Sequence, residues 1–126
     1  MPARILYIED NFENRLLVRR ILLAEGYEFE EADNAELGIQ LALKNPPDLI
    51  LMDISMPNIN GLTATRMIRE SSALQRIPVV ALTANAMQSD LDTTLEAGCD
   101  GYIIKPIDID RFSDQILHYL RSRKSV

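Results

Sequence analysis

The chain has 126 residues, 47% of them hydrophobic and 25% charged, and a formal net charge of −6 at pH 7. This size and composition are typical of one soluble globular domain, and the acidic balance argues against nucleic-acid binding. The single cysteine, Cys99, excludes an internal disulfide scaffold, and the sequence has no leader-like start and no apolar run of membrane-spanning length. We therefore expect a cytoplasmic protein with neither a membrane nor a nucleic acid as partner.

The predicted elements of the first half alternate between strands and helices. An apolar run at 4–8 predicts a buried strand, and helical spacing over 11–25, closed by Gly26, predicts a helix. Residues 27–32 alternate with charge and predict an edge strand. A second helix is expected over 34–43, before Asn and two prolines at 45–47.

The second half repeats this alternation. Apolar runs at 48–52, 77–82 and 101–104 predict three further buried strands. Helical spacing predicts one helix over 61–70, a second that ends at Gly98, and a third that begins at Asp108 or Asp110. We interpret the apolar stripes of the helices as packing faces. In chain order these are Phe12, Leu16, Leu17 and Ile21; Leu37, Leu41 and Ala42; Leu62, Arg66, Met67 and Ile68; Met87, Leu91 and Leu95; and Ile109, Phe112, Ile116 and Leu120.

Five strands that alternate with five helices predict an α/β fold with one parallel sheet. Right-handed crossovers favour a doubly wound (βα)5 arrangement with the flavodoxin-like strand order 2-1-3-4-5. The sequence has no repeat, linker or low-complexity tract. Residues 1–126 are therefore expected to be a single domain without an output domain.

Polar residues follow the predicted strands at the points where they end. They are Glu9, Asp10, Asp53, Thr83 and Lys105. The carboxyl ends of parallel strands share one edge of the sheet, so these side chains should converge there. Three neighbouring carboxylates repel one another unless a cation lies among them, and all-oxygen ligands in an open site favour Mg²⁺, with Mn²⁺ as an alternative. The competing interpretation of a single strand-end acid, Asp10 above all, is a helix N-cap.

The same group of side chains predicts a chemistry. A carboxylate beside a divalent cation, a hydroxyl and an ammonium group can accept a phosphoryl group, because the positive charges neutralise the phosphoryl oxygens. Aspartate is a known nucleophile of this type. Asp53 is the predicted acceptor.

Four motifs at these strand ends match a known family. They are IEDN at 8–11, LMDISMP at 51–57 followed by Gly61, ALTA at 81–84, and KP at 105–106. With them the chain resembles the receiver domain of two-component response regulators over essentially its whole length. Each motif is weak alone, but their order and their positions at strand ends are specific.

The resemblance implies a role for each matching residue. Asp53 is the phosphorylation site, and Asp10 and Asp53 bind Mg²⁺ directly. Glu9 acts through a metal-bound water; many members of the family carry Asp at this position. Thr83 and Lys105 bind the phosphoryl group.

Further positions follow from the same resemblance. The backbone carbonyl of Ser55 is a metal ligand, and the side chains of Ser55 and Asn85 modulate the lifetime of the phosphorylated state. Tyr102 matches an aromatic switch position; the competing interpretation is a half-buried strand tyrosine. Pro106 is expected to follow a cis peptide bond, against the usual preference for trans.

The expected function is a stand-alone signalling switch rather than an enzyme with a separate substrate. It takes phosphate from phosphohistidine on a histidine kinase or phosphotransfer protein. The resemblance implies that it then binds a separate target through the fourth helix, fifth strand and fifth helix, as a monomer or a phosphorylation-dependent dimer.

Two other functions fit this sequence less well. A phosphohydrolase with an aspartyl intermediate needs a second acid two residues after Asp53, where Ser55 stands, and a cap insertion that this sequence lacks. A flavodoxin-type carrier needs a phosphate loop after the first strand, where the acids Glu9 and Asp10 would repel a flavin phosphate.

Overall fold

The computed structural model describes residues 2–54, 61–84 and 87–121. Ser55 and Asn85 lie outside the described residues, so their predicted roles stay predictions. Within the described ranges no helix has both the length and the apolar character needed to cross a membrane.

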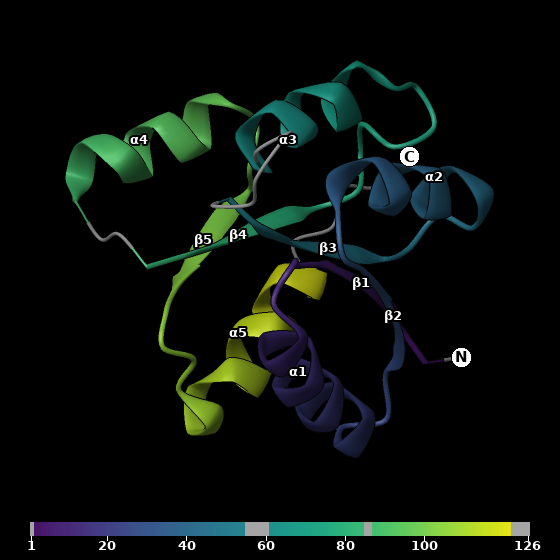
Figure 1. Ribbon diagram of the computed structural model, residues 1–126, viewed down its shortest axis with the longest axis vertical. Helices are drawn as coiled ribbons and strands as arrows, with labels where there is room; N and C mark the ends of the chain where they lie inside the picture. Colours follow the sequence, from purple (N-terminus) through teal and green to yellow (C-terminus); the bar gives the residue numbers. More distant parts are fainter. Residues whose placement is uncertain (1, 55–60, 85–86, 122–126) are drawn as a thin grey trace.

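Strands and helices alternate along the chain. The elements are β1 (Arg4–Ile8), α1 (Phe12–Ala24), β2 (Glu28–Ala32), α2 (Ala35–Lys44), β3 (Leu49–Asp53), α3 (Gly61–Glu70), β4 (Val79–Thr83), α4 (Gln88–Glu96), β5 (Gly101–Ile104) and α5 (Ile109–Arg121). The strands form one parallel sheet in the order β2-β1-β3-β4-β5, with β2 at an edge, as predicted. Helices α1 and α5 cover one face of the sheet, and α2, α3 and α4 cover the other (Figure 1).

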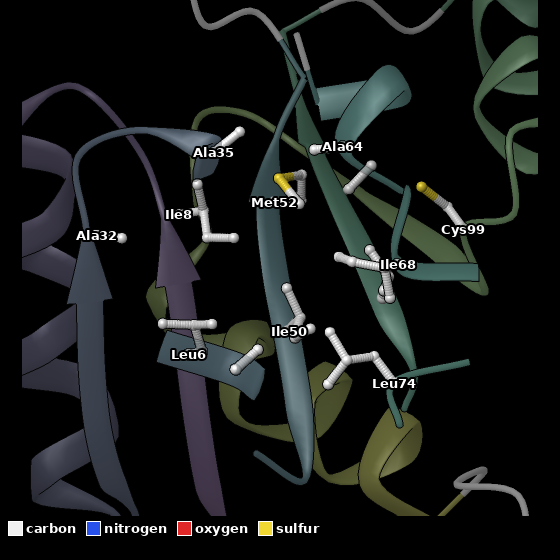
Figure 2. Packing of buried hydrophobic residues seen from close by; sticks show 13 residues of the cluster. Leu6, Ile8, Ala32, Ala35, Ile50, Met52, Ala64, Ile68, Leu74 and Cys99 are labelled. Atoms are coloured by element: carbon white, nitrogen blue, oxygen red, sulfur yellow. The ribbon is translucent and has the colours of Figure 1, made fainter. Parts of the chain in front are cut away.

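Alternation along each strand divides the core into two clusters. On β1, Ile5 and Tyr7 point to the face covered by α1 and α5, whereas Leu6 and Ile8 point to the opposite face. The α1/α5 cluster also contains the helix residues Val18, Leu22, Phe112 and Ile116. The cluster on the other face, with Ile68, Leu74 and Cys99, is shown in Figure 2. Every central strand is thus buried on both sides, which explains its nearly continuous apolar sequence.

The predicted packing face of α1 is confirmed at Ile21, which packs against the α1/α5 cluster, and is wrong at Phe12 and Leu17. Phe12 is 61% exposed and Leu17 is exposed as well, whereas Val18 and Leu22 are fully buried. Neighbouring apolar side chains on a helix point about 100° apart, and the tilt of the helix on the sheet decides which of them is covered. The apolar sequence of α1 predicted a helix but did not by itself predict its buried face.

On α2 the predicted packing face is confirmed at Ala42 and Leu41 and is wrong at Leu37. Leu37 is exposed, and the buried residues are small: Ala35, Gly38 and Ala42. A Cβ atom at Gly38 would overlap the side chain of Ile8 on β1. The contact face of α2 has little side-chain volume, and the helix lies close to the sheet for this reason.

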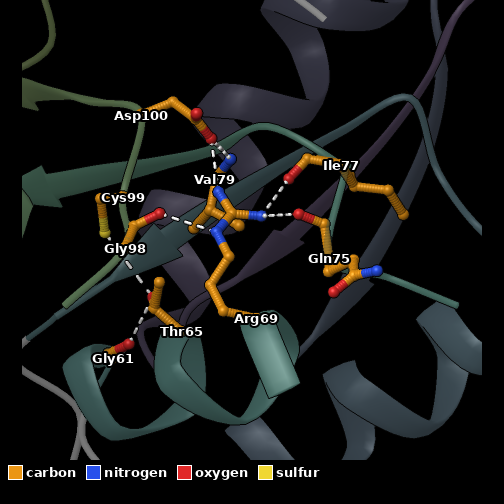
Figure 3. A network of polar contacts seen from close by, with 9 residues as sticks. All are labelled: Gly61, Thr65, Arg69, Gln75, Ile77, Val79, Gly98, Cys99 and Asp100. Atoms are coloured by element: carbon orange, nitrogen blue, oxygen red, sulfur yellow. Dashed lines mark hydrogen bonds and ion pairs between the residues drawn. The ribbon is translucent and has the colours of Figure 1, made fainter. Parts of the chain in front are cut away.

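A polar network joins α3 to the amino ends of β4 and β5 (Figure 3). Arg69 Nε donates to the carbonyl of Gly98 at 2.8 Å, and its Nη2 lies 2.5 Å from Asp100 Oδ2. Its Nη1 donates to the carbonyls of Gln75 and Ile77 at 3.1 and 2.7 Å. The backbone N–H of Val79, the first residue of β4, also donates to Asp100 Oδ2, at 2.8 Å. We call this group the Arg69 network; it ties the segments that precede β4 and β5 to α3.

Candidate functional site

Three carboxylates meet at the carboxyl ends of β1 and β3. Ile8 pairs with Met52 in the parallel sheet, so Glu9 and Asp53 follow at the same level. Glu9, Asp10 and Asp53 each offer a carboxylate oxygen, and these oxygens all lie within 4.8 Å of one another. Glu9 and Asp53 are buried, and Asp10 is exposed. The structure therefore brings together the three acids that the sequence placed at this edge.

The two carboxylate oxygens of Glu9 have different surroundings. Oε1 accepts hydrogen bonds from Asn14 Nδ2 at 2.8 Å, from Lys105 Nζ at 3.1 Å and from the Tyr7 hydroxyl at 3.2 Å. Oε2 is buried, and no donor reaches it within the described part of the chain. Burial of the side chain, followed by its contact with the Asp53 carboxyl, raises the pKa of Glu9 above its ordinary value.

Lys105 links two of the acids. Its Nζ lies 3.1 Å from Glu9 Oε1 and 3.5 Å from Asp53 Oδ1. Its backbone N–H donates to the carbonyl of Thr83 at 2.7 Å, which fixes the start of the Lys105 segment to the end of β4. The peptide bond between Lys105 and Pro106 is cis, as the resemblance implied.

Thr83 and Tyr102 lie on neighbouring strands next to this group. Thr83 is the last residue of β4, is buried, and follows Leu82, which pairs with Asp53 across the sheet. Tyr102 on β5 is half-buried and packs against the cluster under α2, α3 and α4. Its position fits both interpretations made from the sequence, a switch residue and a strand tyrosine.

Asp10 is not the N-cap of α1, because the next residue has that role. Asn11 caps α1, and its side-chain oxygen accepts the backbone N–H of Asn14 at 2.8 Å. The Asp10 carboxylate belongs instead to the acidic group.

Sequence reasoning missed two residues of the site, Tyr7 and Asn14. Tyr7 lies two residues before Glu9 on β1, and alternation along a strand places both side chains on one face. Asn14 stands in the first turn of α1, which begins three residues after Glu9. Burial and the nearby Glu9 carboxylate raise the pKa of Tyr7, so its hydroxyl remains protonated and can donate. The positions of Tyr7 and Asn14 in the sequence point to the site only when Glu9 is already known to belong to it.

The residues present fit a divalent cation. Three carboxylates lie together, the Lys105 ammonium group reaches two of them, Glu9 and Asp53, and no donor among the described residues reaches the buried Oε2 of Glu9. Oxygen ligands and an exposed side at Asp10, which leaves room for bound water, are the surroundings that Mg²⁺ prefers.

Comparisons with known proteins agree with this geometry. A family model described as the response regulator receiver domain matches residues 5–117. The polar-differentiation response regulator DivK of Brucella anthropi is 41% identical over 120 residues, which cover 95% of this chain and 98% of that protein. DivK of Brucella abortus is 39% identical over the same length.

Solved structures of receiver domains have the same fold as this chain. The receiver domain of the sensor histidine kinase PA1611 from Pseudomonas aeruginosa has a TM-score of 0.88 and 31% identity, with 96% of this chain and 99% of that one covered. That structure holds a magnesium ion in its active-site cleft. The chemotaxis protein CheY4 of Vibrio cholerae has a TM-score of 0.90 at 24% identity, covers 94% of this chain and 99% of its own, and shows the shared fold. The chain therefore belongs to the response regulator receiver domains, the phosphorylation-activated switches of two-component signalling.

Proposed function

We propose that Asp53 is the residue that accepts the phosphoryl group, and that the donor is phosphohistidine on a histidine kinase or phosphotransfer protein. The observation that carries this proposal is the position of Asp53 within the acidic group. Asp53 ends a central strand, is 4% exposed and has the Lys105 ammonium 3.5 Å from its Oδ1. Glu9 suits the role less well, because its Oε1 already accepts three donors.

The transfer exchanges one bond to phosphorus for another. An oxygen of the Asp53 carboxylate forms a bond to phosphorus, the P–N bond of phosphohistidine breaks, and its electron pair returns to the imidazole ring. Asp10 and Asp53 would hold Mg²⁺ directly, with Glu9 beside them, and the ion would neutralise charge on the phosphoryl oxygens. Lys105 turns from the carboxylates to a phosphoryl oxygen, and the Thr83 hydroxyl donates a hydrogen bond to another.

A depression beside the site supports docking of the donor protein. It has a volume of about 360 Å³ and is lined by Asn14, Leu17, Ala84, Lys105, Pro106 and Ile107. The exposed Leu17 and the apolar Ile107 give this depression a surface on which a helix carrying phosphohistidine can rest. The depression also includes Lys105, so a histidine seated there is close to the acceptor.

The output is a change of surface on α4, β5 and α5. Met87, Leu95 and Ile104 are exposed apolar residues in this part of the molecule. Phosphorylation draws Thr83 toward the acceptor, Tyr102 on the neighbouring strand adjusts, and a separate target protein binds the state that results. A shift between two populated states suffices for such a switch, with or without dimerisation.

Incubation with acetyl phosphate and Mg²⁺ tests the acceptor. Intact-protein mass spectrometry should show the mass of one added phosphoryl group on the wild type and on the control Asp114→Asn, an exposed acid on α5. Asp53→Asn should gain none, and EDTA should stop the reaction. Equal phosphorylation of Asp53→Asn would overturn the proposal.

A further inference from the structure

Tyr7 is a fully buried tyrosine whose hydroxyl reaches the edge of the acidic group. Its ring packs in the α1/α5 cluster, and its hydroxyl donates to Glu9 Oε1 at 3.2 Å. The function described so far gives this hydroxyl no part. A phenylalanine would fill the same space, so the ring alone does not account for a hydroxyl at this position.

Three donors converge on one oxygen of Glu9 from separate parts of the chain. Tyr7 belongs to β1, Asn14 to α1, and Lys105 to the segment after β5. The other oxygen, Oε2, is buried and has no donor within residues 2–54, 61–84 and 87–121, and the carboxylates of Asp10 and Asp53 lie close to Glu9. This asymmetry fixes the orientation of the carboxylate: one oxygen is held by protein donors, and the other remains for a cation or its bound water.

The three donors differ in how firmly the fold holds them next to Glu9 Oε1. Under the proposed function Lys105 turns to the phosphoryl group, so its bond to Glu9 is temporary. Tyr7 is held by its packed ring, and Asn14 is held in the first turn of α1, where its backbone N–H also bonds to the Asn11 side chain. These two neutral donors can keep Glu9 Oε1 in place after Lys105 has moved.

We propose that Tyr7 is a positioning residue for the cation site, which holds Glu9 Oε1 together with Asn14 so that Oε2 stays directed toward the cation. The proposal rests on the proposed function for the identity of the cation. It adds a residue that touches neither the cation nor the phosphoryl group and that acts through Glu9.

The test is the affinity of the unphosphorylated chain for Mg²⁺, measured by isothermal titration calorimetry. Tyr7→Phe keeps the ring and removes one hydrogen bond to a charged group, so we expect a Mg²⁺ Kd roughly three- to tenfold higher than that of the wild type. The matched control is Tyr119→Phe, which removes the hydroxyl of a half-buried tyrosine on α5 that lies against Gly101. Its Mg²⁺ Kd should equal that of the wild type.

A melting curve in EDTA separates positioning from a purely structural role. We expect the Tm of Tyr7→Phe in EDTA to stay near that of the wild type, with a smaller rise than the wild type on addition of Mg²⁺. An unchanged Mg²⁺ Kd in Tyr7→Phe would overturn the proposal, as would an equal loss of affinity in Tyr119→Phe. Phosphorylation of Asp53→Asn would refute the proposed acceptor instead, and the Mg²⁺ measurement does not depend on that result.

Discussion

Two polar clusters lie at opposite edges of the same sheet, and they are built in opposite ways. At the amino ends of β4 and β5, the Arg69 guanidinium meets three backbone carbonyls and the Asp100 carboxylate, so that donors and acceptors match. At the carboxyl ends of β1 and β3, three carboxylates lie together, one ammonium group reaches two of them, and Glu9 Oε2 lacks a donor among the described residues. The first cluster is complete in the protein alone, and the second is not.

This difference separates stability from function. A buried polar group that has all its partners holds segments together, whereas one that lacks a partner costs free energy until a ligand supplies it. The Arg69 network should therefore contribute to folding whether or not a cation is present. The acidic group should lower stability without the cation and raise it once the cation is bound. Four experiments test this contrast.

The largest effect is expected from Arg69→Ala. The substitution removes the Arg69 donor from the carbonyls of Gly98 and Ile77 and leaves the partly buried Asp100 carboxylate with the Val79 N–H alone, which should lower the free energy of unfolding by about 2–4 kcal/mol. Urea denaturation measures this loss. Arg66→Ala, an exposed position on the same helix, is the control and should change it by less than about 0.5 kcal/mol. A small loss in Arg69→Ala together with a changed Mg²⁺ Kd would remove the contrast between the two edges.

Addition of Mg²⁺ should have the next largest effect. At a concentration one hundred times its Kd, a ligand that binds the folded state alone stabilises it by about 2.7 kcal/mol. We expect this gain in the wild type and in Arg69→Ala, reversed by EDTA and absent from Asp10→Asn combined with Asp53→Asn. Thermal denaturation with and without Mg²⁺ measures it. A gain that persists in the double variant would place the cation elsewhere.

A smaller effect is expected from Glu9→Gln without a cation. The buried carboxylate is replaced by an amide of the same shape, which keeps an acceptor for Asn14 and offers a donor toward Asp53. The free energy of unfolding in EDTA should rise by about 1 kcal/mol, because removing an unfavourably buried charge outweighs the weakened contact with Lys105. Urea denaturation in EDTA and in Mg²⁺ gives both values, and the stabilisation by Mg²⁺ should fall. A lower free energy of unfolding for Glu9→Gln in EDTA would contradict this expectation, because it would show that the Glu9 charge is already compensated without a cation.

The pH dependence of stability should be the smallest effect. The folded-state pKa of Glu9 is raised above its ordinary value of 4.5, so in EDTA the folded protein binds this proton more tightly than the unfolded chain. The contribution of Glu9 is fully present below pH 4.5 and is lost as the pH rises through the folded-state pKa. Stability in EDTA should therefore decline over this window, by less than about 1 kcal/mol per pH unit. Urea titrations at successive pH values measure the slope, and Glu9→Gln should show a shallower one.

The sequence determined most of the fold because its signals are local. Apolar runs short enough to be strands, helical spacing between them, and turn residues such as Gly26 predicted all ten elements and their order in the sheet. The convergence of Glu9, Asp10 and Asp53 followed from the same reasoning, since parallel strands end at one edge. These inferences needed no knowledge of which atoms touch.

Tertiary structure decided what depends on contacts between distant segments. The buried face of α1 is set by its tilt on the sheet, and that of α2 by the close approach of Gly38 to Ile8. The asymmetry of Glu9 depends on donors from three elements, one of them 96 residues away along the chain. No local pattern encodes such a convergence, because it arises only when the packed sheet brings the ends of its strands and the start of α1 together. The sequence thus placed the acids at one edge, and the folded structure decided which oxygen of Glu9 is left for a cation.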